Sequence, residues 1–264
     1  MTKKPKRFEE FYFSVVDDIL DIDIVVDYVA LHDGDTGKFT GSMFCLECKK
    51  AKLAFVNKTT KRRAHLRRIG TLKHEDSCSY NYDYASKKVV KKYVDSLSYN
   101  EIQDKLSSIM KMLLKNHQKK NNKAKETNCS ATENTENAML IHEKVNNRGV
   151  LKALRRKRLN SWIDESDGEE FCAFYGKVKL EVVGKEKIIK DSQKSYKYNL
   201  LLLYTKNRKG EWKYRTSIYR RQIRDIVDKD SVYQIVIIGK LNFDYNFWTI
   251  KLANDNAIGY RAIE

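Results

Sequence analysis

The feature that most constrains this chain is a set of three cysteines and one histidine arranged in two close pairs. Two residues separate Cys45 from Cys48, three separate His74 from Cys78, and 25 residues lie between the pairs. A tetrahedral Zn²⁺ ion needs four nitrogen and sulfur ligands, and two short-range pairs joined by a loop can supply them. The spacing therefore predicts a Zn²⁺ site formed by these four residues.

The number of protein ligands indicates what such an ion would do. Four protein ligands leave no coordination position for water or substrate, so the spacing predicts a structural site rather than a catalytic one. Metal binding would contribute folding free energy to a small lobe. His65, which ends a predicted strand between the two pairs, is an alternate ligand in place of His74.

Basic residues surround the predicted metal site. Four arginines lie between the two ligand pairs: Arg62, Arg63, Arg67 and Arg68. A metal-pinned loop that displays positive charge is more typical of nucleic-acid binding than of catalysis. We therefore take these arginines as candidate nucleic-acid contacts.

Three segments around the ligands carry a family resemblance: Phe44–Cys48, Arg63–Arg68 and His74–Tyr80. Together they resemble the zinc-ribbon-like N-terminal module of the competence protein CoiA family, over residues 25–95 only. Members of that family join the module to a nuclease domain and are implicated in DNA uptake and recombination. The resemblance therefore implies a role with DNA, while residues 139–264 do not obviously match that nuclease domain.

The chain departs from the family pattern at two positions. Leu66 stands where an aromatic residue is usual, and Arg68 stands where a second histidine is usual. These departures favour His74 over His65 as the metal ligand. His65 stays an alternate ligand or a residue next to the ligands.

The chain carries a large excess of positive charge, with a formal net charge of +17. Such an excess attracts polyanions, with nucleic acid first and an anionic membrane surface second. No apolar stretch approaches the roughly 18–20 residues of a membrane span, and the basic N-terminus precedes no apolar signal core. Five cysteines are an odd and sparse set for a secreted disulfide scaffold. We expect a cytoplasmic protein with reduced thiols and no membrane partner.

The sequence predicts an α+β protein in three parts. A zinc-binding basic N-terminal domain, a small β-lobe with a long helix, covers residues 1–115. A flexible linker covers 116–138, because this segment has too few apolar residues to offset the entropy lost on ordering. A β-rich domain, an antiparallel β-barrel or sheet, covers 139–264.

Local patterns predict the elements of the N-terminal domain. β-Branched residues predict a strand at 23–31, and two apolar runs at 53–56 and 64–66 predict a hairpin between the ligand pairs. From about residue 84, apolar residues recur at three- and four-residue intervals. This spacing predicts one long helix, or two helices broken near residues 98–100.

The C-terminal part is rich in predicted strands. They cover residues 171–183, 196–205, 211–219, 233–240 and 247–252, with 258–263 as a further edge strand. A short helical or irregular bridge lies between the third and the fourth. Five or six strands with such a bridge fit a small closed sheet, and we expect an OB-type barrel, with a plain sandwich or meander as the alternative.

Two stretches of this domain are candidate nucleic-acid contacts. The first holds five cations in seven residues, among them Arg155, Arg156, Lys157 and Arg158. The second is the strand at 211–219, where alternation predicts one buried face and one cationic face. The cationic face contains Lys213 and Arg215, and the buried face contains Trp212, Tyr214, Thr216 and Ile218. Nearby aromatic residues could stack bases if they are exposed.

The combined features predict a zinc-containing protein that binds nucleic acid, with DNA favoured over RNA. We expect non-specific binding of single-stranded DNA in a bacterial, phage or mobile-element setting. One alternative is a metal-dependent DNA nuclease, in which Asp191, Glu211 and Lys213 supply the carboxylates and the lysine of a PD-(D/E)xK site. Another is an interaction protein whose basic surface binds an acidic protein partner.

Overall fold

The computed structural model describes residues 8–60, 62–70, 73–114, 137–145, 148–163, 165–168, 170–188, 195–244 and 247–263. The chain divides into two compact units. The N-terminal unit comprises Met1–Asp83 with His117–Asn137, and the C-terminal unit comprises Tyr84–Asn116 with Ala138–Glu264. Most of the predicted linker at 116–138 lies outside the described residues.

The N-terminal unit combines short strands with one helix around a phenylalanine-rich core. Its elements are β1 (Glu10–Phe13), β2 (Asp18–Asp21), α1 (Ile22–Leu31), β3 (Met43–Phe44), β4 (Leu53–Val56) and β5 (His65–Arg68), with 3₁₀ turns at Gly37–Phe39 and Ser79–Asn81. β1 pairs antiparallel with both β2 and β3. β4 and β5 form the hairpin that the sequence predicted between the ligand pairs. The core includes Phe8, Phe11, Phe13 and Phe39.

The segment predicted as a strand at 23–31 is instead part of helix α1. The Asp21 side chain caps the helix by accepting a hydrogen bond from the main-chain N–H of Asp23 at 2.9 Å. Ile22, Val25 and Val29 then lie on one helical face, and all three are buried. The β-branched residues favoured a strand, but the cap and the three- and four-residue spacing specify a helix.

Two helices belong to the C-terminal unit, α2 (Lys87–Ser96) and α3 (Tyr99–Leu113). The break between them lies where the sequence predicted it, because Ser98 and Glu101 form a capping box. Their apolar faces pack on the C-terminal sheet. The first segment of the N-terminal unit therefore ends at Asp83, before these helices, whereas the prediction placed the helical segment in a domain of residues 1–115. In the described parts of the chain, no helix is both long and apolar enough to cross a membrane.

Five strands of the C-terminal unit close into a β-barrel. They are β9 (Cys172–Ile188), β10 (Ser195–Lys206), β11 (Trp212–Tyr219), β12 (Val232–Asn242) and β13 (Thr249–Leu252). Around the ring, β9 pairs with β10, β10 with β11, β11 with β13, β13 with β12, and β12 with β9. Only the β11–β13 pair is parallel, through Ile218 and Ile250. The predicted strands are confirmed apart from their ends, and the bridge between β11 and β12 is irregular.

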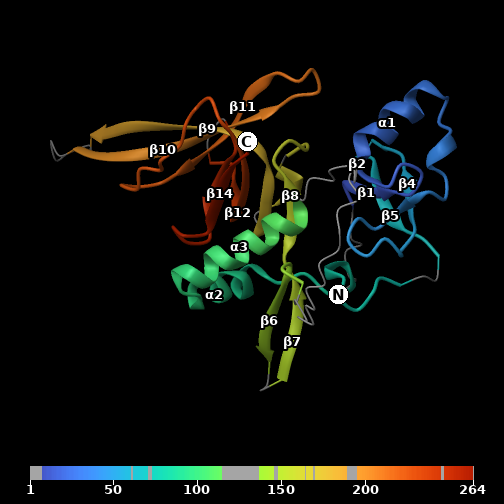
Figure 1. Ribbon diagram of the computed structural model, residues 1–264, viewed down its shortest axis with the longest axis horizontal. Helices are drawn as coiled ribbons and strands as arrows, with labels where there is room; N and C mark the ends of the chain where they lie inside the picture. Colours follow the sequence, from blue (N-terminus) through green and yellow to red (C-terminus); the bar gives the residue numbers. More distant parts are fainter. Residues whose placement is uncertain are drawn as a thin grey trace, which may run out of the picture. The chain divides into compact units, whose positions relative to one another are not determined.

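β9 is long enough to pair with two strands in succession. Cys172–Lys179 pairs with β12, and Lys179–Ile188 pairs with β10. Figure 1 shows the β9–β10 ribbon extending beyond the barrel. Other strands flank the barrel or lie apart from it: β8 (Arg155–Arg158) beside β9, β14 (Ile258–Ile263) beside β12, and a separate hairpin of β6 (Leu140–Val145) and β7 (Arg148–Ala153).

The barrel wall separates two hydrophobic clusters. Inside the barrel, Leu180, Leu201 and Ile235 are completely buried. Outside it, α2 and α3 cover β12 and the first half of β9, where Leu106 packs in one cluster with Val236. The outer face of β10, β11 and the second half of β9 is exposed or half-buried instead, apart from the buried Ser217. The fold therefore leaves one side of the barrel open to solvent.

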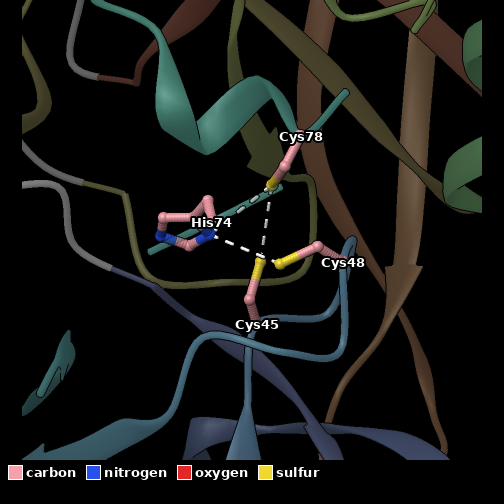
Figure 2. Close-up of side chains that lie close together, drawn as sticks. All are labelled: Cys45, Cys48, His74 and Cys78. Carbon is pink, nitrogen blue, oxygen red and sulfur yellow. Dashed lines mark hydrogen bonds between the residues drawn. The ribbon is translucent and has the colours of Figure 1, made fainter. Parts of the chain in front are cut away.

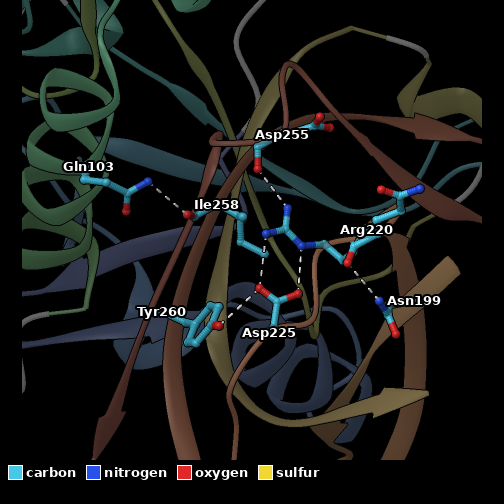
Figure 3. Close-up of polar contacts among 8 residues, drawn as sticks. Gln103, Asn199, Arg220, Asp225, Asp255, Ile258 and Tyr260 are labelled. Atoms are coloured by element: carbon cyan, nitrogen blue, oxygen red, sulfur yellow. Dashed lines mark hydrogen bonds and ion pairs between the residues drawn. The ribbon is translucent and has the colours of Figure 1, made fainter. Parts of the chain in front are cut away.

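A buried ion pair holds the irregular bridge after β11 against the barrel (Figure 3). Arg220 Nε and Nη2 lie 2.8 and 3.1 Å from the two carboxylate oxygens of Asp225, and their side chains are only 7% and 5% exposed. Arg220 also donates to the main-chain oxygen of Asp255 at 2.8 Å. The Tyr260 hydroxyl donates to Asp225 at 3.2 Å. Every polar contact of this pair is therefore made inside the protein.

We predict that Arg220→Met lowers the free energy of unfolding by about 3–5 kcal/mol, because it leaves the Asp225 carboxylate buried without a cationic partner. Urea unfolding followed by circular dichroism measures this loss. Adding Asp225→Leu to the same variant should recover part of it. The matched control is Arg221→Ala, since the neighbouring Arg221 side chain is exposed. Equal losses in Arg220→Met and Arg221→Ala would contradict the prediction.

Candidate functional site

The four predicted metal ligands come together in the N-terminal unit, and their side chains point toward one another (Figure 2). Cys45 Sγ lies 3.8 Å from Cys78 Sγ. His74 Nδ1 lies 3.6 Å from Cys48 Sγ and 3.5 Å from Cys78 Sγ. All four ligand atoms lie within 4.8 Å of one another.

These distances fit a tetrahedral metal site. A metal–sulfur bond of about 2.3 Å and a metal–nitrogen bond of about 2.0–2.1 Å put neighbouring sulfurs about 3.8 Å apart and sulfur and nitrogen about 3.6 Å apart. The observed separations agree with both values, so the cluster can hold a metal ion. His65 is not part of the cluster, and its Nδ1 lies 3.0 Å from the main-chain oxygen of Arg63.

The backbone turns sharply so that Cys45 and Cys48 reach the same point. Lys49 adopts a left-handed φ of 54° and donates its N–H to the main-chain oxygen of Cys45 at 2.9 Å. A hydrogen bond from the Cys78 thiol lowers the pKa of Cys45 to about 4, and the N–H groups of Cys48 and Glu47 also lower this pKa. The same bond raises the pKa of Cys78. Because metal ligands must be deprotonated, a bound cation would replace the proton that the two sulfurs share.

Contacts outside the four ligands hold the two ligand pairs together. Glu47 accepts hydrogen bonds from Ser79 N at 2.6 Å and Ser79 Oγ at 2.8 Å, which joins the first cysteine pair to the segment after Cys78. The His74 ring stacks on Phe8 and Tyr80, with centroids 5.9 and 5.8 Å apart. The sequence analysis did not identify Glu47, although its place between Cys45 and Cys48 was a usable signal.

The four candidate arginines of this unit lie on or just before strand β5. Arg62, Arg67 and Arg68 are exposed and Arg63 is half-buried. Leu66, between them, is buried and donates its N–H to the main-chain oxygen of Phe8 at 3.3 Å. Because Phe8 also contacts His74, the arginine-bearing strand is connected directly to the metal cluster.

The basic run of the C-terminal unit forms a strand rather than an exposed loop. It is β8, which pairs in parallel with the first residues of β9. Lys157 is buried and forms an ion pair with Asp167 at 3.0 Å. The Arg155 guanidinium lies 4.4 Å from the Tyr84 ring centroid, and Arg156 and Arg158 are half-buried. The run therefore contributes to packing at the edge of the sheet, and Lys157 is not available to a phosphate.

The predicted alternation along β11 fails at a β-bulge. Leu203 pairs with Thr216 and Tyr204 pairs with Tyr214, so Arg215 is the additional residue. Its Nε donates to the main-chain oxygen of Leu159 at 2.6 Å, and the guanidinium also donates to the main-chain oxygen of Ser161. Arg215 is thus occupied within the fold.

Tyr214, which was predicted to be buried, is 44% exposed because the bulge changes the side to which it points. Lys213 is exposed and pairs with the exposed Glu211 at 3.4 Å. Two of the three residues proposed for a nuclease site thus form a surface ion pair. Asp191, the third, lies outside the described residues.

A row of aromatic side chains occupies the open side of the barrel. In the register of the strands, alternate residues of β10 share the outer face with their partners on β9 and β11. We call this surface the aromatic face, and its aromatic and cationic members are Tyr196, Tyr198, Tyr204, Trp212, Tyr214 and Tyr219, with Lys179, Lys185, Lys187 and Lys206. Leu200, Leu202, Val183 and Ser217 lie on the same face, between the two groups of rings. Glu181 also lies on it and accepts a hydrogen bond from the Tyr204 hydroxyl at 2.7 Å.

Rings and cations are in contact on this face. Tyr198 lies 5.8 Å from Tyr196 and 5.2 Å from Tyr219, measured between ring centroids. The ammonium group of Lys206 lies 5.4 Å from the centroid of Trp212. Tyr196 and Tyr219 are 40% and 48% exposed. The rings therefore do not fill a core and are available for contact with a ligand.

Comparison with known proteins finds no matching family model, no matching curated protein and no matching solved structure.

We predict that the purified protein binds one metal ion per chain and that Cys78→Ser abolishes this binding. Losing one of the three thiolates removes folding free energy from the N-terminal unit, so its melting temperature should fall by several degrees. Native mass spectrometry and a thermal melt measure both effects. His65→Ala is the matched control, and it should keep the ion and the melting temperature. Loss of the ion in His65→Ala, or its retention in Cys78→Ser, would show that the ligand set is wrong.

Proposed function

We propose that this protein is a zinc-containing nucleic-acid-binding protein that binds single-stranded DNA with little sequence preference. The observation that carries the proposal is the aromatic face. Exposed rings stack on bases of any sequence at roughly 1–3 kcal/mol per base, and neighbouring cations follow the phosphate backbone. One surface provides both the rings and the cations. The rings are those of Tyr196, Tyr198 and Tyr219, and the cations are the lysines of β9.

The order of strands supports an OB-type barrel. Numbered along the chain, the five strands of the ring pair in the order first, second, third, fifth, fourth and first again, with a parallel contact between third and fifth. This is a five-stranded Greek-key barrel, and in OB-folds the second and third strands form the oligonucleotide-binding face. Here those strands are β10 and β11, which carry most of the aromatic face.

The metal cluster supports Zn²⁺ and a structural role. Three thiolates and one imidazole form a Cys₃His set, which is a common structural zinc site. Such an ion would fix the β5 strand, and the exposed Arg67 and Arg68 on it, with Arg62 just before it, add a second cationic surface. The resemblance of the surrounding segments to the CoiA module supports a bacterial, phage or mobile-element setting.

We expect fluorescence anisotropy with a labelled single-stranded oligonucleotide to show affinity that falls steeply with salt, by a slope of about −0.7 per phosphate contacted. Tyr219→Ala should weaken binding by about 5- to 100-fold, because it removes one stacking platform. Tyr219→Phe should bind as the wild type does, since it keeps the ring.

The matched control is Tyr99→Ala, because Tyr99 is 62% exposed but lies at the start of α3. Affinity that is indifferent to salt, or equal losses in Tyr99→Ala and Tyr219→Ala, would contradict the proposal. Cleavage of labelled DNA with Mg²⁺ that is lost in Glu211→Ala would favour the nuclease instead. A stoichiometric acidic protein that co-purifies without nucleic acid would favour a protein partner.

A further inference from the structure

A cationic cavity of about 310 Å³ lies in the C-terminal unit, among α2, β12, β13 and the bridge that follows β11. Four cationic residues line it, Lys91, Arg221, Lys240 and Lys251, together with the carboxylate of Asp255. Two of the four are in ion pairs, Lys91 with Asp95 and Arg221 with Asp255. Its volume is close to the lower limit for small-molecule sites, which begins at about 300 Å³. The cavity therefore has room for an anionic group, and its lining holds more cations than carboxylates.

Two of these lysines face each other across a strand pair. Lys240 of β12 and Lys251 of β13 are direct partners in the antiparallel register, so their side chains leave the sheet on the same side. Like charges in such a pair destabilise a sheet. Lys251 forms no ion pair with any residue that the structure describes. An anion bound beside Lys251 would offset its positive charge.

Arg221 is placed in the cavity by an unusual backbone conformation. Its φ is 53°, a left-handed value that non-glycine residues adopt only where the surroundings hold them. The main-chain oxygen of Arg221 accepts a hydrogen bond from Asn199 N at 2.7 Å, which fixes this turn. Its Nη1 lies 3.6 Å from Asp255, a long ion pair on an exposed side chain. The guanidinium can therefore turn toward a ligand without breaking a buried contact.

The cavity adjoins the aromatic face around the barrel wall. Ile218 and Ile250 are partners in the parallel β11–β13 contact, and both are buried in the barrel. The residues that follow them, Tyr219 and Lys251, therefore lie next to each other on the outer surface. A strand whose base stacks on Tyr219 has its backbone within reach of Lys251.

We infer that this cavity is a phosphate site that holds one backbone phosphate of the nucleic-acid strand lying on the aromatic face. A phosphate presents several acceptor oxygens, so it can contact Lys240, Lys251 and Arg221 at the same time. The nucleic-acid source of the phosphate rests on the proposed function, whereas the phosphate chemistry of the cavity does not. Free inorganic phosphate is the other source with the same chemistry.

Two measurements on the full chain test the inference. In the first, inorganic phosphate is titrated in low-salt buffer, and the backbone amide signals of Arg221 and Lys251 are followed by NMR. Both should shift in the wild type, and the Arg221 signal should stay unchanged in Lys251→Ala. In the second, Lys251→Ala should weaken binding of a single-stranded oligonucleotide about 5- to 10-fold and reduce the salt slope by about 0.7, one phosphate contact. Lys251→Arg should keep both properties.

Lys111→Ala is the matched control, because Lys111 is an exposed lysine in the last turn of α3 and does not line the cavity. Its affinity should change less than twofold, with the salt slope of the wild type. Equal oligonucleotide binding by Lys251→Ala and Lys111→Ala overturns the assignment to the strand, whatever the phosphate titration gives. If the wild type binds no oligonucleotide, the proposed function fails. The titration then decides alone: shifts lost in Lys251→Ala support a site for free phosphate, and no shifts overturn the site.

Discussion

The pairing of β9 with two different strands is the constraint on which the C-terminal unit depends. Lys179 pairs with Val232 of β12 and with Tyr204 of β10, so the strand passes from one neighbour to the other at that residue. This change of partner closes the barrel, because β10 and β12 are the two end strands of the row β10–β11–β13–β12 and β9 pairs with both. It also divides the outer surface. The first half of β9 is buried under α2 and α3, while the second half shares the exposed face of β10 and β11. A surface suited to flat ligands is thus a consequence of how the ring closes.

The N-terminal unit is stabilised differently, because its strands are only two to four residues long. Such short strands form few ladder hydrogen bonds, and the unit relies on its phenylalanine core and on contacts around the metal cluster. Phe8 connects the two, since it stacks on His74 and exchanges main-chain hydrogen bonds with Leu66. The position of the exposed arginines on β5 therefore depends on the same contacts that orient a metal ligand.

Much of this organisation could be predicted from the sequence, where a local pattern and the tertiary structure agree. The ligand spacing identified all four members of the cluster, and apolar runs bounded by turns identified each barrel strand. Predictions failed where a single side-chain hydrogen bond, a β-bulge or a contact between distant segments determines the local structure. The cap formed by Asp21 turns a β-branched run into α1, and the bulge at Arg215 exposes Tyr214. Helices α2 and α3 belong to the C-terminal unit because their apolar faces pack on its sheet. The spacing of apolar residues predicts an apolar helical face but does not say which surface that face packs against.

The net charge indicated a polyanionic ligand but could not locate its surface, because the cations of this chain serve two physical purposes. Lys157, Arg215 and Arg220 satisfy buried carboxylates or carbonyl groups, and removing any of them would leave a polar group unpaired inside the protein. Lys251 and the lysines of the aromatic face do not pair with buried carboxylates or carbonyl groups in the part of the chain that the structure describes. A cation that pairs with no buried group of the protein is a better indicator of a ligand-binding surface than the density of cations along the sequence. By that criterion the open side of the barrel, and not the dense basic run of β8, is where a nucleic-acid strand would bind.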